Sequence, residues 1–105
     1  MSRKTYTENE IILCTFIARF GKKGLIAEEF ISNLENRSVA SIKLKIQNII
    51  YMLDDEGVPR DPNGSPLSGM PPGKGGRRTN WDVVEKFCTL DEKSFSKKCY
   101  EIIRA

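Results

Sequence analysis

The 105-residue chain contains no histidine, and its three cysteines form no closely spaced pair. Without an imidazole it can hold neither a Ser/His/Asp nor a Cys/His catalytic triad, and no histidine-ligated metal. The thiols of Cys14, Cys88 and Cys99 are a poor zinc site and an odd number for a disulfide framework. We therefore expect buried thiols in a reducing compartment, no enzymatic activity, no metal and no cofactor.

Long apolar runs are also missing from the sequence. No run approaches the ~18 residues that span a bilayer, and the basic pair Arg3 and Lys4 is not followed by an apolar segment. Hydrophobic residues make up 39% of the chain and charged residues 30%, as in soluble globular proteins. We expect one small cytoplasmic domain that makes no membrane contact.

The net charge of +3 is concentrated in one half of the chain. Residues 1–53 hold eight Lys/Arg against five Asp/Glu, whereas residues 54–80 and residues 81–105 are each balanced. Such an excess is compatible with a polyanionic partner without requiring one.

Hydrophobic periodicity predicts two helices before residue 35. Thr7 and Glu10 form a capping-box pattern that starts a helix over residues 8–20, which is apolar on nearly all sides and therefore central. A second helix is expected over residues 25–34, with an apolar stripe toward the core and its glutamates toward water. The stripe consists of Ile26, Ala27, Phe30, Ile31 and Leu34, and the glutamates are Glu28, Glu29 and Glu35.

The third helix is expected to run from Val39 to Leu53 after the N-cap residue Ser38. Its isoleucines recur within about 90° of arc and predict a buried side. The opposite side is unusual, because it lacks the Glu and Lys of an ordinary solvated face. On that side we expect Ala40, Ser41, Leu44, Gln47, Asn48 and Tyr51, with Lys45 at the flank.

Residues 54–80 contain all five prolines and six of the eight glycines, so no regular element is expected there. Residues 69–75 superficially resemble a phosphate-binding loop, but only three residues separate the two glycines where four are needed. Residues 73–78 instead predict a flexible basic arm for nucleic acid, or a solvated linker. The basic residues of this arm are Lys74, Arg77 and Arg78.

These patterns together predict an all-α fold with three parts. Residues 1–53 form a three-helix helix-turn-helix unit, residues 54–80 a long flexible basic Pro/Gly loop, and residues 81–105 two C-terminal helices. We expect the C-terminal helices to pack back onto the same single domain. The side chains expected to make that contact are Trp81, Phe87 and Phe95.

The third helix is the candidate for DNA recognition, since a helix-turn-helix meets base edges with the N-terminal part of this element. Asn48 can pair with adenine, and Lys45 can reach guanine or phosphate. The residues expected where the helix start meets the DNA backbone are Arg37, Ser38 and Ser41. The structural alternative is that this face packs beneath the C-terminal helices and that Asn48 satisfies a core backbone group.

Residues 37–49 follow the pattern Arg-x-x-x-Ser-Ile-x-x-Lys-Ile-x-Asn, with Asp54 shortly after. The run resembles a segment of small helical modules attached to bacterial HNH endonucleases and related restriction proteins, and is more distantly similar to Myb-like and GcrA-like helix-turn-helix domains. The resemblance implies DNA binding through Arg37, Ser41, Lys45 and Asn48. The chain differs in having no nuclease portion after the module, so the resemblance implies binding rather than cleavage.

We therefore expect a non-catalytic protein that binds double-stranded DNA through a recognition helix at about residues 39–53 and the basic loop. The expected setting is regulatory, including transcription regulation, restriction-associated or phage. The full set of expected DNA contacts is Arg37, Ser38, Ser41, Leu44, Lys45, Asn48, Lys74, Arg77 and Arg78.

Two other functions stay open on the sequence. A small inhibitor of a nucleic-acid enzyme would bind its target protein through Leu44, Tyr51, Met52 and Met70. A cryptic enzyme would need a magnesium cluster built from Asp54, Asp55, Glu56 and Asp61. A protein partner or a homodimer is open in either case.

Overall fold

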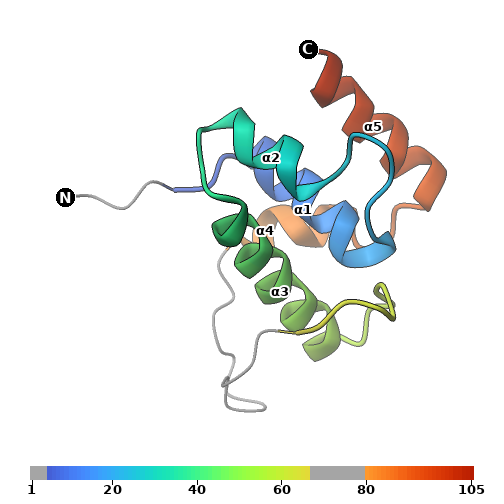
Figure 1. Ribbon diagram of the computed structural model, residues 1–105. Coiled ribbons are helices and arrows are strands. Elements are labelled where there is room, and N and C mark those ends of the chain that lie inside the picture. The colour runs from blue at the N-terminus through green and yellow to red at the C-terminus, as the bar shows by residue number, and fades with distance from the viewer. Residues whose placement is uncertain (1–4, 67–79) are drawn as a thin grey trace.

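The computed structural model describes residues 5–66 and 80–105. These two ranges are helical and contain no strand, which confirms the all-α prediction; Lys23 and Ile26 form an isolated bridge. The helices are α1 (Glu8–Phe20), α2 (Glu28–Leu34), α3 (Val39–Asp55), α4 (Trp81–Val84), the short 3-10 helix η1 (Glu85–Phe87) and α5 (Glu92–Arg104). Figure 1 shows α1 between α3 on one side and α5 on the other.

Helix α1 is the central element, as predicted, and packs against α2, α3, α4 and α5. The capping box starts it: Glu10 N donates to Thr7 Oγ1 at 3.2 Å, and Thr7 N donates to the Glu10 carboxylate at 2.8 Å. Every residue from position 11 to position 18 is buried. The helix ends at Phe20, and its C-cap residue Gly21 has a φ of 85°, in the left-handed region that favours glycine.

Helix α2 begins at Glu28, three residues later than predicted. The reason is a tight turn in which Lys23 and Ile26 exchange backbone hydrogen bonds of 3.1 and 2.9 Å. The turn changes which residues face the core, so Glu28 is buried against Lys22 at 2.9 Å while Leu34 is partly exposed. The expectation that Glu28 faces water and Leu34 the core is therefore wrong.

Helix α3 begins where predicted and extends two residues further, to Asp55. Ser38 caps it, since its Oγ accepts from Ser41 N at 3.1 Å. After the helix, Arg60 donates to both oxygens of Asp54 at 3.0 and 3.2 Å. The same guanidinium donates to the carbonyls of Asp61 and Gly64, which holds this segment in turns. The predicted arm residues Lys74, Arg77 and Arg78 lie outside the described residues.

The C-terminal helices pack onto α1, as predicted. Phe95 is fully buried, and its ring centroid lies 5.3 Å from that of Phe16 and 5.1 Å from that of Phe87. Asp91 caps α5 by accepting from Ser94 N at 3.0 Å. Trp81 is half-buried against the same core.

The thiols differ from the expectation at one position. Cys14 and Cys99 are buried as predicted, whereas Cys88 is only half-buried because it follows η1 in the connection to α5. In the described ranges, none of the helices has the length and apolar character needed to cross a membrane.

Candidate nucleic-acid interface

The segment that joins α2 to α3 is a short turn over residues 35–38. Asn36 adopts a positive φ of 56°, which asparagine tolerates better than most residues. Arg37 N donates to Ser32 O at 2.8 Å, and this bond ties the turn back to α2. The start of α3 is therefore held in a fixed direction relative to α2.

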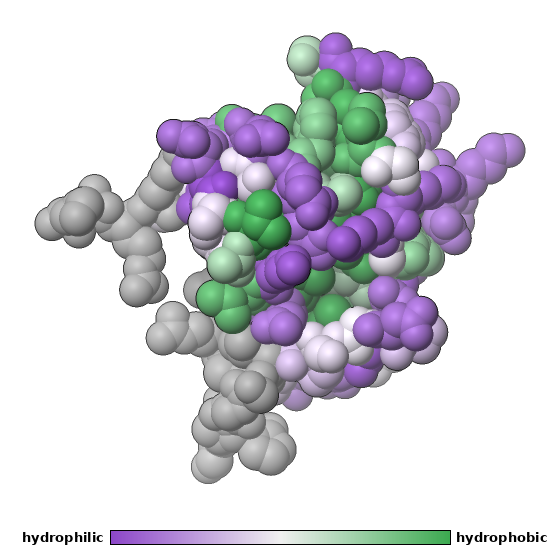
Figure 2. Space-filling view, in the orientation of Figure 1, coloured by the Kyte–Doolittle hydropathy of each residue, from purple (hydrophilic) through white to green (hydrophobic). Residues whose placement is uncertain are grey.

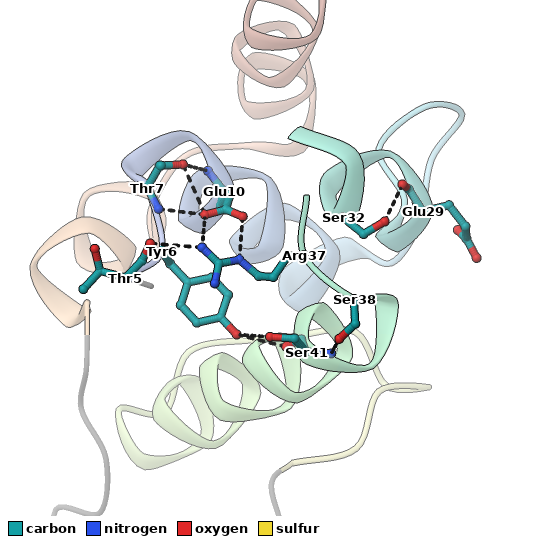
Figure 3. Close-up of polar contacts among 9 residues, drawn as sticks. All are labelled: Thr5, Tyr6, Thr7, Glu10, Glu29, Ser32, Arg37, Ser38 and Ser41. Atoms are coloured by element: carbon teal, nitrogen blue, oxygen red, sulfur yellow. Dashed lines mark hydrogen bonds and ion pairs between the residues drawn. The ribbon is translucent and has the colours of Figure 1, made fainter. Parts of the chain in front are cut away.

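Arg37 was predicted to meet the DNA backbone, but its guanidinium points inward. Its Nε donates to Glu10 Oε2 at 2.8 Å and its Nη2 to Glu10 Oε1 at 2.9 Å. Nη2 also donates to the carbonyl of Thr5 at 3.0 Å. Figure 3 shows this ion pair between α1 and the turn. The expected surface position of Arg37 is therefore wrong, since only 9% of its side chain is exposed.

The Glu10 carboxylate remains ionised although it is fully buried. Burial by itself raises its pKa, but hydrogen bonds from Arg37 and from the backbone of Thr7 outweigh that effect and hold the pKa below its usual value. The same bond to Glu10 raises the pKa of Arg37. The two side chains form a charged pair that fastens the turn to α1.

Tyr6 covers one side of α3. Its ring lies under the Arg37 guanidinium, 4.0 Å from centroid to Cζ. Its hydroxyl lies 2.8 Å from Ser41 Oγ and donates to Ser41 O at 3.1 Å. Ser41 is half-buried, and its side chain bonds to Tyr6 within the protein (Figure 3).

Lys45 and Asn48 were expected on or beside the exposed side of α3, and both are buried. Their exposed fractions are 5% and 6%, and Lys45 Nζ donates to Asn48 Oδ1 at 3.3 Å. The Lys45 ammonium lies 5.3 Å from the ring centroid of Tyr6, so the segment before α1 helps to cover it. Burial lowers the pKa of Lys45 to about 8. The expectation of an exposed Lys45 and Asn48 is wrong.

The side of α3 that does face solvent is a different stripe, which we call the outer face. It consists of the exposed residues Ala40, Lys43 and Leu44 and the half-buried residues Gln47 and Tyr51. These positions follow the three- and four-residue spacing of one helix side. Leu44 is 56% exposed. Lys43 and Gln47 make no side-chain hydrogen bond or ion pair with any residue that the structure describes.

Leu44 was predicted to lie on this face, whereas Lys43 was not among the predicted DNA contacts. The helical periodicity of the sequence already places Lys43 on the same side as Gln47, since the two lie about 40° apart at 100° per residue. Ser38 is exposed at the helix start, and its hydroxyl serves as the N-cap.

The residues of the two alternative functions are only partly brought together. Met52 is fully buried and cannot contact a partner, and Met70 lies outside the described residues. Asp54 pairs with Arg60 at 3.0 Å. Within residues 5–66 and 80–105, no three His, Cys, Asp or Glu side chains gather as ligands for a metal ion, so the acidic residues 54–56 and 61 form no such cluster.

Comparisons with known proteins found no match to this chain. No protein-family model matches the sequence, no curated protein matches it, and no solved structure matches it.

Proposed function

We propose that this chain is a non-catalytic DNA-binding protein that presents the outer face of α3 to the major groove of double-stranded DNA. One observation carries the proposal. A short helix, a four-residue turn over 35–38 and a long helix follow one another, and the first half of the long helix leaves Lys43 and Gln47 without described partners. A helix-turn-helix has this order, and its recognition helix reads bases with its N-terminal part.

The side chains of the outer face suit the major groove. The Gln47 amide can donate and accept at the same time and therefore matches the exposed edge of adenine. Lys43 offers a flexible charge for guanine or a phosphate, and Leu44 can contact the methyl group of thymine. The outer face therefore offers both kinds of contact that base edges accept, hydrogen bonds and an apolar contact.

The buried polar network supports the same proposal by orienting the helix. The Arg37 to Glu10 pair and the Tyr6 to Ser41 bonds connect the start of α3 to α1 and to the segment before it. Side chains that read bases must be held closely in place by the structure behind them. In this proposal Arg37, Ser41 and Lys45 position α3, together with Asn48, and do not contact DNA.

The basic residues of the Pro/Gly loop are proposed as additional DNA contacts. Lys74, Arg77 and Arg78 are proposed as phosphate contacts on the ground of their charge and the neighbouring glycines alone. The proposed setting is regulatory, restriction-associated or phage, and it rests on the resemblance of residues 37–49 to modules of restriction proteins.

Fluorescence anisotropy with a random-sequence duplex across a salt series tests the proposal. Affinity should fall steeply as salt rises, because lysine contacts to phosphates release counterions. Lys43→Ala should lower the slope of log affinity against log salt by about one. Lys98→Ala removes another exposed lysine, on α5, and should leave the slope unchanged. Absence of binding, or binding that does not respond to salt, would contradict the proposal.

One observation favours the second candidate function, a small inhibitor that binds a protein. Leu44 is 56% exposed at the centre of the outer face, with Ala40 and Tyr51 on the same side. Figure 2 shows hydrophilic and hydrophobic side chains mixed over α3, while a broader hydrophobic area lies beside α5. Protein-binding surfaces usually carry larger apolar patches than α3 offers. We therefore place DNA binding first.

A further inference from the structure

A pocket of about 270 Å³ opens beside the outer face of α3. Its walls come from α3, from the end of α1 with Gly21 and Lys22, from Glu28 at the start of α2, and from the turns of residues 61–65. Hydrogen bonds fix these walls: Asp61 N donates to Ala18 O at 3.0 Å, and Arg60 donates to the carbonyls of Asp61 and Gly64. The pocket is therefore formed by the fold itself.

The floor of the pocket is apolar and its rim is polar. Ile17, Ile46 and Ile50 form the floor, and all three belong to the buried core. The rim carries amide and hydroxyl groups from Gln47, Asn63 and Ser65. An apolar floor with a few polar groups is typical of sites for small organic molecules. A bare inorganic ion would leave the isoleucine side chains without a contact.

The charges in the pocket come in both signs. Lys22 Nζ lies 2.9 Å from Glu28 Oε1, so these two charges neutralise each other. Lys43 has no ion-pair partner among the described residues. Asp61 accepts from Asn63 N at 3.1 Å but forms no ion pair in the described part of the chain. One cation and one anion are therefore available to a ligand.

We propose that this pocket binds a small aliphatic zwitterion, of the class of free branched-chain α-amino acids. The ligand carboxylate would meet Lys43, its ammonium group Asp61, and its side chain the isoleucine floor. A ligand with only a carboxylate is attracted by Lys43 but repelled by Asp61. A ligand with only an amine is attracted by Asp61 but repelled by Lys43. A molecule with both charges complements Lys43 and Asp61 at the same time.

Calorimetric titration of the full chain with L-leucine tests the proposal against three matched compounds. Isocaproate lacks the ammonium group, isoamylamine lacks the carboxylate, and free glycine lacks the side chain. We expect each to bind at least about tenfold more weakly than leucine, since each loses one charged hydrogen bond or the apolar contact. No heat with millimolar leucine overturns the proposal, and so does isocaproate binding as tightly as leucine.

Variants assign the two charges. Lys43→Met should weaken leucine and isocaproate but not isoamylamine, and Asp61→Asn should weaken leucine and isoamylamine but not isocaproate. Asparagine keeps the acceptor for Asn63 N, so the turn should persist. The control Asp82→Asn changes an exposed carboxylate outside the pocket and should leave leucine binding unchanged. Equal losses in the control would overturn the assignment.

An occupant should also affect DNA binding, a step that rests on the proposed function. Lys43 and Gln47 belong both to the pocket and to the outer face. Saturating leucine should therefore weaken the DNA complex several-fold, because it engages the charge of Lys43. Leucine binding is measured without DNA, so failure of the DNA proposal leaves that result standing. Leucine that binds without changing DNA affinity overturns the coupling.

Discussion

Arg37 and Glu10 lie 27 residues apart in the chain and meet in a two-point ion pair of 2.8 and 2.9 Å. The pair joins the turn before α3 to the first turn of α1, where Glu10 also completes the capping box. One carboxylate thus fixes both the start of the central helix and the direction of the helix proposed to meet DNA.

Breaking this pair should destabilise the protein strongly. Arg37→Met leaves the buried charge of Glu10 without its cation, and we expect a loss of about 3 kcal/mol in the free energy of unfolding, measured by urea denaturation. The double variant Arg37→Met, Glu10→Gln should lose less than the two single variants added together.

The exposed pair Lys23 and Glu92 is the matched control. Its charged atoms lie 3.8 Å apart and both side chains are about half exposed. Lys23→Met should change the free energy of unfolding by less than about 0.5 kcal/mol, because solvent screens such pairs. If both cation removals cost the same, the Arg37 to Glu10 pair has no special role.

Stability should depend on pH through Lys45. Burial lowers its pKa to about 8 in the folded chain, against 10.5 for an unperturbed lysine. Between these values the unfolded chain binds more protons, so this residue makes stability rise with pH across that window, by on the order of 3 kcal/mol in total. Below about pH 8 the folded chain must keep a charge in its interior.

Comparison with Lys45→Met isolates this effect. The buried thiols Cys14 and Cys99 act in the opposite direction, because burial raises their pKa and the folded chain retains protons that the unfolded chain loses. Both thiols are present in wild type and variant, so their contributions largely cancel in the difference. The stability of the wild type relative to the variant should increase from pH 8 to 10.5. A constant difference would show that Lys45 is not buried as a cation.

The three thiols should react in a fixed order. Burial raises the pKa of Cys99 to about 12 and raises that of Cys14 and Cys88 as well, and the thiolate is the reactive form. Only Cys88 is half-exposed. Iodoacetamide at pH about 8 should therefore modify Cys88 first and the other two only after urea unfolding. Peptide mass mapping reads the order, and early labelling of Cys14 would mean that α1 is less protected than its burial indicates.

Local patterns predicted the helices well and the polar faces poorly. The capping residues Thr7 and Ser38 fixed the starts of α1 and α3, because an N-cap acts within four residues. The late start of α2 depends on the Lys23 to Ile26 turn, which hydrophobic periodicity does not register.

In the candidate site too, local patterns predict some features, and contacts with distant residues decide others. Lys45 lies about 40° from Ile49 at 100° per residue, so its position at the edge of the buried side was available from the sequence. The sequence does not show that Tyr6 covers Lys45, because Tyr6 hydrogen-bonds to Ser41, a residue 35 positions away in the chain. A contact between distant segments does not affect the hydrophobic periodicity of either segment, so the sequence pattern does not predict it. Polar residues that resemble a DNA-reading motif are therefore found inside the protein.

Adjacent amides on α3 give the sharpest test of which side of the helix reads DNA. Gln47 lies on the outer face without a described side-chain partner, whereas Asn48 is 6% exposed and accepts from Lys45. Gln47→Ala should cost about 1 to 3 kcal/mol at one base position of a preferred site and leave the melting temperature unchanged.

Asn48→Ala should do the reverse, because it leaves the buried Lys45 ammonium without the Asn48 carbonyl. We expect a loss of about 1 to 3 kcal/mol in stability, the typical cost of removing a hydrogen bond to a charged group, and a uniform effect across DNA sequences among molecules that remain folded. Thermal melting together with anisotropy on single-base variants of a selected duplex separates the two outcomes. If Asn48→Ala changed the preference at one base position while Gln47→Ala did not, α3 would have to turn the Asn48 side toward DNA, and the outer face would not be the reading surface.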